Sequence, residues 1–236
     1  MKEIKAILFD VFGTVVDWRK SIANEALNIG KKYNIEANWG QFADEWREAY
    51  HDQMKAVNSG ERKWINVDQI HFERLEFLLQ KYNFPKINYE EKLKLNKAWH
   101  RLSPWSDSVI GLKRLKTKYI IAPLSNGNIS LLTNMGKHAN LPWDAILSAE
   151  ISKKYKPDIQ VYQDAARILG NDLEETLMVA AHKFDLLGAL EAGLRVAMVT
   201  RPDEFGDNKK TVIENDKRWE FYCRDFNQLA DELNCD

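Results

Sequence analysis

Cysteines, long apolar runs and net charge are all scarce in this sequence, and each shortage argues against a class of protein. The two cysteines, Cys223 and Cys235, lack the spacing of metal ligands, and a reduced, cytoplasmic chain is the simplest expectation. No run reaches the ~18 apolar residues of a membrane span, and the apolar stretch near the N-terminus is too short for a signal peptide. A formal net charge of -1 gives no electrostatic reason to expect nucleic acid or a membrane surface as partner.

Short apolar segments rich in β-branched residues predict buried strands. They lie at residues 6–9, 119–124, 176–179 and 195–199. Stretches with a helical pattern follow the later strands or lie between them, at residues 129–139, 158–169 and 184–193. Strands that alternate with helices are typical of the α/β class, in which a doubly wound parallel sheet is covered by helices on both faces.

The segment between the first strand and residue 100 has a different pattern. It shows helical periodicity, with Phe42 and Trp46 on one face, and no convincing strand. We therefore predict two domains. A core domain is formed by residues 1–16 and 101–236, and a helical cap domain, formed by residues 17–100, is inserted after the first strand and its loop.

Polar side chains gather where the predicted strands end. In doubly wound sheets, ligands bind at the carboxyl ends of the strands. Four polar segments lie at such ends or in a nearby loop, at residues 10–17, 124–127, 153–158 and 180–185. Taken singly, Asp10 could cap a helix and Ser125-Asn126 could form a turn. Their convergence on one edge of the sheet favours a functional site. The polar segment 203–216 carries none of these patterns and is expected to be a mobile loop.

These motifs resemble those of the haloacid dehalogenase superfamily. Asp-x-x-Gly-Thr starts at Asp10 after the first strand, Ser-Asn-Gly starts at Ser125 after the next, and Lys156-Pro and Asp185 follow in the family's order. The resemblance covers nearly the whole chain. It implies a Rossmann-like core, with a cap inserted where members of the superfamily carry one.

Within the superfamily, the sequence is most similar to the type II L-2-haloacid dehalogenases. These enzymes carry Trp-Arg on a cap helix, as in Trp46-Arg47, and Lys-Pro-x-x-x-Val-Tyr, as in residues 156–162. The resemblance implies hydrolysis of L-2-haloalkanoates to 2-hydroxyacids with inversion, through an aspartyl ester. Water is the second substrate, no metal or other cofactor is expected, and a homodimer is expected because type II relatives are commonly dimers.

The residue two positions after the nucleophile helps to separate two chemistries of this superfamily. Its phosphatases resemble one another in carrying a second Asp there, which protonates a poor alkoxide leaving group. Here the position is Phe12, which cannot give a proton, whereas a halide leaves as a stable anion and needs none. Mg²⁺ prefers several oxygen ligands, and the late loop offers only Asp185 as a carboxylate. Carbon is therefore the favoured electrophile.

The resemblance implies four catalytic roles. Asp10 attacks the halogen-bearing carbon, Lys156 keeps its carboxylate ionised and oriented, and Thr14 holds it by a hydrogen bond. Asp185 acts as the base, or orients the base, for the water that hydrolyses the ester.

The resemblance also implies how the substrate is bound. Ser125 and the backbone amides after Asp10 bind its carboxylate, and Arg47 and Asn126 receive the halide. The pocket is walled by aromatic rings, namely Phe12, Tyr162 and Phe184.

The late loop departs from the family pattern. The better-known type II enzymes have Ser and Asn where this chain has Ala180 and His182. Those groups help to hold the hydrolytic water, so we hypothesise that His182 replaces part of their function, either by placing the water or as a base near neutral pH. The alternative is a surface or capping His.

Other functions stay open on the sequence alone. A Mg²⁺-dependent phosphatase of small molecules is one, and a phosphonatase-like hydrolase, which needs a cap Lys such as Lys55 or Lys63 for a Schiff base, is a variant of it. A catalytically silent binding protein is an alternative of another class, although Asp10, Lys156 and Asp185 together have no obvious purpose in a binding module.

Overall fold

The computed structural model describes residues 2–206 and 215–236. Most of the predicted loop 203–216 therefore lies outside the described residues. A six-stranded sheet forms the centre, in the order β5-β4-β1-β6-β7-β8, and every neighbouring pair is parallel. The strands are β1 (Ala6–Phe9), β4 (Ile120–Ser125), β5 (Leu147–Ser148), β6 (Thr176–Ala180), β7 (Arg195–Val199) and β8 (Phe221–Cys223). This confirms the doubly wound α/β prediction and adds two short edge strands, β5 and β8.

The first strand of the chain lies in the interior of this sheet. Ala6 of β1 pairs with Ile120 of β4 on one side and with Thr176 of β6 on the other. All four residues of β1 are fully buried, because helices cover both faces of the sheet. The residue that follows β1, Asp10, is therefore held at the middle of the sheet's carboxyl edge.

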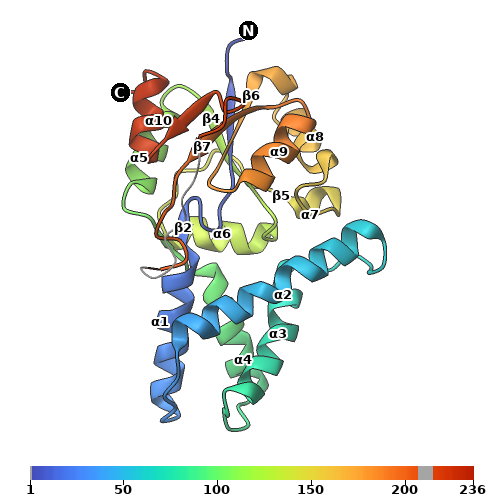
Figure 1. Ribbon diagram of the computed structural model, residues 1–236, viewed down its shortest axis with the longest axis vertical. Coiled ribbons are helices and arrows are strands. Elements are labelled where there is room, and N and C mark those ends of the chain that lie inside the picture. The colour runs from blue at the N-terminus through green and yellow to red at the C-terminus, as the bar shows by residue number, and fades with distance from the viewer. Residues whose placement is uncertain (1, 207–214) are drawn as a thin grey trace.

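Helices pack on both faces of the sheet in the core (Figure 1). They are α5 (Ser108–Lys116), α6 (Ile129–His138), α7 (Ala149–Ser152), α8 (Ile159–Ile168), α9 (Lys183–Glu191), α10 (Phe226–Glu232) and the short 3₁₀ helix η2 (Leu173–Glu175). The three helices predicted between the strands correspond to α6, α8 and α9. Both chain termini lie at the end of the core opposite to the inserted helices (Figure 1).

Two short antiparallel strands, β2 (Val16–Asp17) and β3 (Ser103–Pro104), flank the inserted region. Helices joined by loops make up the region between them. Its helices are α1 (Trp18–Lys32), α2 (Trp39–Ser59), α3 (Val67–Lys81), α4 (Tyr89–Asn96) and the 3₁₀ helix η1 (Lys97–His100). Asp17 starts α1, because its side chain accepts a hydrogen bond from the backbone N–H of Lys20. Figure 1 shows α1 descending from the core and α2 crossing the inserted region, with α3 and α4 on the side of α2 away from the core.

Candidate active site

Asp10, directly after β1, is the centre of a buried network of charges. Its side chain is 11% exposed. Oδ1 accepts a hydrogen bond from Lys156 Nζ at 3.0 Å, and Oδ2 accepts one from Thr14 Oγ1 at 2.7 Å. His182 Nδ1 lies 3.0 Å from the same Oδ2. Burial by itself raises the pKa of Asp10, but the charges and hydrogen bonds of Lys156 and His182 outweigh it and hold the pKa well below its usual range. Asp10 is thus a carboxylate at neutral pH.

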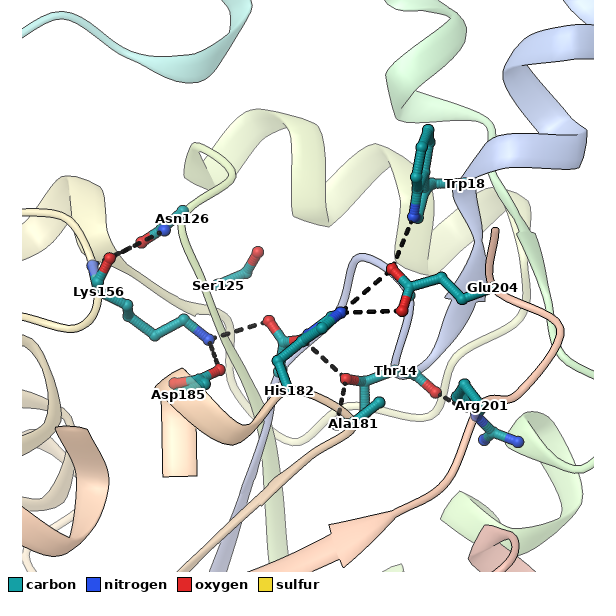
Figure 2. Close-up of polar contacts among 12 residues, drawn as sticks. Thr14, Trp18, Ser125, Asn126, Lys156, Ala181, His182, Asp185, Arg201 and Glu204 are labelled. Atoms are coloured by element: carbon teal, nitrogen blue, oxygen red, sulfur yellow. Dashed lines mark hydrogen bonds and ion pairs between the residues drawn. The ribbon is translucent and has the colours of Figure 1, made fainter. Parts of the chain in front are cut away.

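Lys156 is fixed from three sides. Besides Asp10, its Nζ donates to the backbone carbonyl of Leu124 at 2.8 Å and contacts Asp185 Oδ2. The other oxygen of Asp185 accepts a hydrogen bond of 2.6 Å from the hydroxyl of Tyr162. The side chain of Asp185 is fully buried, and each of its two oxygens is bound to a protein group. Asp185 therefore orients Lys156 through a direct ion pair (Figure 2).

Thr14 connects the loop after β1 to the loop after β6. Its hydroxyl donates to Asp10 and accepts a hydrogen bond of 2.9 Å from the backbone N–H of Ala181. Its backbone carbonyl accepts another from Arg201, whose guanidinium also forms a double hydrogen bond with Asp107. These contacts fix the nucleophile's loop against the neighbouring strand end.

His182 bridges two carboxylates, and one of them has no counterpart in the sequence motifs. Its Nε2 lies 3.0 and 3.1 Å from the carboxylate oxygens of Glu204, which also accepts a hydrogen bond of 2.9 Å from Trp18 Nε1. Figure 2 shows the chain of contacts from Trp18 through Glu204 to His182. Burial lowers the pKa of His182, but Glu204 and Asp10 raise it to about 10. At neutral pH the ring is an imidazolium that donates to both carboxylates.

Gly13 makes room for Glu204. A Cβ on Gly13 would lie 2.1 Å from Glu204 Oε1, and the φ of Gly13 is +88°. Both conditions require glycine at this position. The glycine of the first motif thus admits a carboxylate that is more than 190 residues away in the sequence.

Arg47 on α2 lies above this floor, in a cage of aromatic rings. Its guanidinium carbon lies 5.1 Å from the ring centre of Phe12, 5.0 Å from that of Trp18 and 4.9 Å from that of Tyr50. Its Nη1 is buried and has no hydrogen-bond partner among the described residues. A buried guanidinium donor without a partner is suited to an incoming anion, because leaving it unpaired carries an energetic cost.

Ser125 and Asn126 follow β4. Ser125 Oγ accepts a hydrogen bond from the backbone N–H of Gly127, which leaves its own proton available for a further acceptor. Asn126 Oδ1 accepts the backbone N–H of Lys156 at 2.8 Å, and its amide nitrogen lies 3.3 Å from the sulfur of Met54 on α2. Asn126 therefore joins two core loops and touches the cap.

A cavity of about 830 Å³ lies between this floor and α2. Seven of the predicted site residues line it, namely Asp10, Phe12, Arg47, Asn126, Lys156, His182 and Phe184. The other four predicted residues do not form part of its lining. They are Thr14, Ser125, Tyr162 and Asp185. Among these, Tyr162 is buried with its hydroxyl on Asp185 rather than at the cavity wall.

Sequence reasoning did not assign several residues that the fold brings to the cavity. The lining includes Glu204 and Phe205 from the loop after β7, Trp18 from α1, and His51 and Lys55 from α2. Of these, the sequence suggested only Lys55, and only for the phosphonatase-like alternative. None of them belongs to a recognisable motif. The helical spacing of Arg47, His51 and Lys55 along α2 is the one signal that could have grouped the last two with a predicted site residue.

The described residues contain neither a cluster of metal-binding side chains nor a helix that could cross a membrane. Within residues 2–206 and 215–236, no group of three or more His, Cys, Asp or Glu side chains is placed to hold a metal ion. Within the same residues, no helix is both long and apolar enough to cross a membrane.

Comparisons with known proteins identify the family and support the fold. The family model for haloacid dehalogenase-like hydrolases matches residues 4–193. The chain is 28% identical to (S)-2-haloacid dehalogenase 4A of Burkholderia cepacia, with 96% of this chain and 98% of that protein covered. It resembles the crystal structure of a defluorinating L-2-haloacid dehalogenase with a TM-score of 0.95 at 40% identity, covering 98% of this chain and 96% of the other. A second L-2-haloacid dehalogenase structure gives a TM-score of 0.91 at 36% identity, covering 98% and 99%.

Proposed function

This chain belongs to the haloacid dehalogenase-like hydrolases, and we propose that it hydrolyses small L-2-haloacids to 2-hydroxyacids through an ester of Asp10. The observation that carries the proposal is the setting of Asp10. Its carboxylate is ionised, held by Lys156, Thr14 and His182, and lines a cavity whose opposite side presents an unpaired guanidinium donor. A nucleophile thus faces a group suited to the leaving halide.

The first step is a displacement at carbon. A lone pair of the Asp10 carboxylate forms a bond to the halogen-bearing carbon, and the carbon–halogen bond breaks with its electron pair on the halide. Attack opposite to the leaving group inverts the carbon. Arg47 and Asn126 receive the halide, and Phe12 contributes an apolar wall in place of an acid. Because its buried donor has no partner among the described residues, the guanidinium favours the developing anion more than the neutral carbon–halogen bond.

The second step is hydrolysis of the ester, and we assign its water to His182. In the free enzyme, two carboxylates raise the pKa of His182 to about 10. Esterification of Asp10 removes one of these charges, so the imidazolium releases its proton to solvent more readily, and this is the proton that accompanies the halide in the overall reaction. The neutral ring then accepts a proton from water as the oxygen attacks the Asp10 carbonyl carbon. The alkoxide leaves with the remaining proton, which restores the Asp10 carboxylate and the imidazolium.

Glu204 positions His182 for this step. Its carboxylate is hydrogen-bonded to Trp18 and to His182 Nε2, which turns Nδ1 toward Asp10. Asp185 acts differently: since both of its oxygens are already bound, it orients Lys156 instead of contacting the water. The backbone amides after Asp10 bind the substrate carboxylate, and Ser125, although it does not line the cavity, keeps a hydroxyl proton for the same group.

The test is release of halide from L- and D-2-chloropropionate, each with and without EDTA. The proposal expects halide release from the L isomer that EDTA leaves unchanged, and D-lactate, the hydroxyacid of inverted configuration, as the product. Absence of halide release, together with Mg²⁺-dependent cleavage of a phosphoester, would contradict it and support the phosphatase alternative.

We also propose a cytoplasmic location and a homodimer. Both cysteines are free and buried, as suits a reducing compartment. Light scattering of the purified chain would measure its mass in solution, and a monomer at micromolar concentration would contradict the dimer.

A further inference from the structure

The cavity is larger than a three-carbon haloacid requires. Its volume of about 830 Å³ lies within the ~300–1,000 Å³ range of cavities that hold drug-sized ligands. Beyond Arg47, the lining continues along α2 with His51, Met54, Lys55 and Asn58. The outer part of the cavity has room for a substrate that extends past the reacting carbon.

One face of α2 presents three nitrogen-bearing side chains to this space. Arg47, His51 and Lys55 follow one another at intervals of four residues, so they lie on one side of the helix, spaced by roughly 6 Å along its axis. All three line the cavity. We call His51 and Lys55, together with the cavity space beside them, the outer subsite.

No carboxylate forms an ion pair with either residue of the outer subsite among the described residues. Neither His51 nor Lys55 makes a hydrogen bond with a described residue, and the ring centre of His51 lies 5.6 Å from that of Tyr50. Burial and the positive charges of Arg47 and His182 lower the pKa of His51, and they outweigh the neighbouring carboxylate of Asp52, which raises it. An anion in this space would relieve that repulsion.

The carboxylates around the same cavity do not supply that anion. Asp44 is bound to Arg19 and Glu45 to Lys81. Asp10 and Glu204 are held by the charge network of the floor. Glu48, on α2 one turn before His51, is exposed and is the carboxylate that would compete for the outer subsite.

We propose that the outer subsite binds a second carboxylate of the substrate, so that the enzyme prefers 2-halo dicarboxylic acids to monocarboxylic acids of equal chain length. This inference rests on the proposed dehalogenation. The first carboxylate and the halogen occupy the positions already assigned beside Asp10 and Arg47. The second carboxylate then faces Lys55, whose flexible stem reaches along the helix, and His51.

The probes are L-2-chlorosuccinate and L-2-chlorobutanoate, which share a four-carbon chain and differ in the second carboxylate. The measurement is kcat/KM for halide release. One good charge-assisted contact worth about 1.4 kcal/mol gives a preference of about tenfold for chlorosuccinate. Lys55→Met removes most of that preference and leaves chlorobutanoate unchanged. His51→Gln has a smaller effect in the same direction, and Glu48→Gln increases the preference.

Lys63→Met is the matched control, because Lys63 is an exposed cap lysine that does not line the cavity. It should leave both substrates unchanged. Equal kcat/KM for the two substrates, or a preference that survives Lys55→Met, overturns the proposed subsite. Better turnover of a long apolar 2-chloroalkanoate than of chlorosuccinate would assign the outer space to an apolar tail instead.

A binding measurement separates this inference from the proposed reaction. D-malate and D-2-hydroxybutanoate are the products that inversion gives from the two probes, and calorimetry with the Asp10→Asn variant measures their affinity without turnover. Tighter binding of malate that depends on Lys55 supports the subsite even if no haloacid is hydrolysed. Halide release from chlorobutanoate with no preference for malate or chlorosuccinate supports the reaction and removes the subsite.

Discussion

The two sides of the cavity differ in whether their charged groups are paired. We call the side formed by the core loops around Asp10 the floor, and the side formed by α2 with Arg47 the roof. On the floor, every charged group contacts a partner: Lys156 lies between Asp10 and Asp185, and His182 lies between Asp10 and Glu204. On the roof, Arg47 is surrounded by rings and keeps an unpaired donor. The floor is thus organised before the substrate arrives, whereas the roof is completed by the anion that the substrate brings.

This difference separates two kinds of contribution to catalysis. Groups that are already paired cost little to reorganise during the reaction and hold the nucleophile in one geometry. Groups that lack a partner gain one only when a charge appears beside them, so they discriminate between substrates and stages of the reaction. Changes on the floor should therefore stop chemical steps, and changes on the roof should alter which anion is accepted.

The largest effect is expected from removing the nucleophile on the floor. Asp10→Asn should lower kcat by a factor on the order of 10⁴ or more, because an amide at this position is a far weaker nucleophile. Halide release is the measurement. Asp17→Asn is the matched control, since Asp17 starts α1 and Asn is an equally good helix cap. Activity retained in Asp10→Asn would transfer the nucleophile to another residue.

His182→Gln should separate the two chemical steps. We expect ester hydrolysis to slow by about 10²–10⁴-fold, the usual contribution of a general base, while alkylation of Asp10 proceeds. A protein adduct with the mass of the substrate minus the halide should then accumulate in mass spectrometry. Glu204→Gln should cause a smaller accumulation, because it removes the group that orients the ring. A variant that turns over at the wild-type rate without an adduct would remove His182 from this role.

Arg47→Met tests the roof directly. Loss of the unpaired donor should reduce the rate of Asp10 alkylation by about 10²-fold, as for other groups that stabilise a developing anion. Arg47→Lys should recover only part of that loss, because an ammonium lacks the planar shape that fits the three rings. Single-turnover halide release measures both. Equal slowing of alkylation and ester hydrolysis would indicate a general structural defect instead.

The smallest effect is a pH dependence of stability that originates on the floor. Because the pKa of His182 is raised to about 10, its ion pairs contribute fully below its unfolded pKa of about 6.5 and are lost as pH rises through the folded value. The Tm difference between wild type and His182→Gln should thus shrink from pH 6 to pH 10, by several degrees, since ~1 kcal/mol shifts Tm by about 2–4 °C at this chain length. A difference that grows with pH would contradict the imidazolium.

The strand-end rule and the motifs were sufficient for most of the floor. Asp10 and His182 follow predicted strand ends, Lys156 lies in a predicted loop, and the order of the motifs predicts all three at one edge of the sheet. The edge strands β5 and β8 have two and three residues, too few for a periodic pattern to be recognised. Their existence depends on pairing with β4 and β7.

Glu204 is a residue of the site that no local sequence pattern indicates. It lies in a segment expected to be only a polar loop, yet it contacts Trp18, 186 residues away in the sequence. No spacing rule connects these positions, because the contact exists only once β1 and β7 lie in one sheet. Tyr162 shows the converse: its motif was recognised, but the direction of its hydroxyl, toward Asp185, depends on how α8 packs against α9.

Because β1 lies in the interior of the sheet, it must wait during synthesis for the strands that pair with it. The first strand to be synthesised pairs with residues 120–123 and 176–179, so Ala6 precedes its second partner Thr176 by 170 residues. At roughly 5–20 residues per second, that interval is about 10–30 seconds. The inserted helices can form within it, because they contact one another locally. The apolar strand that carries Asp10 stays without its second neighbour until three quarters of the chain has been made.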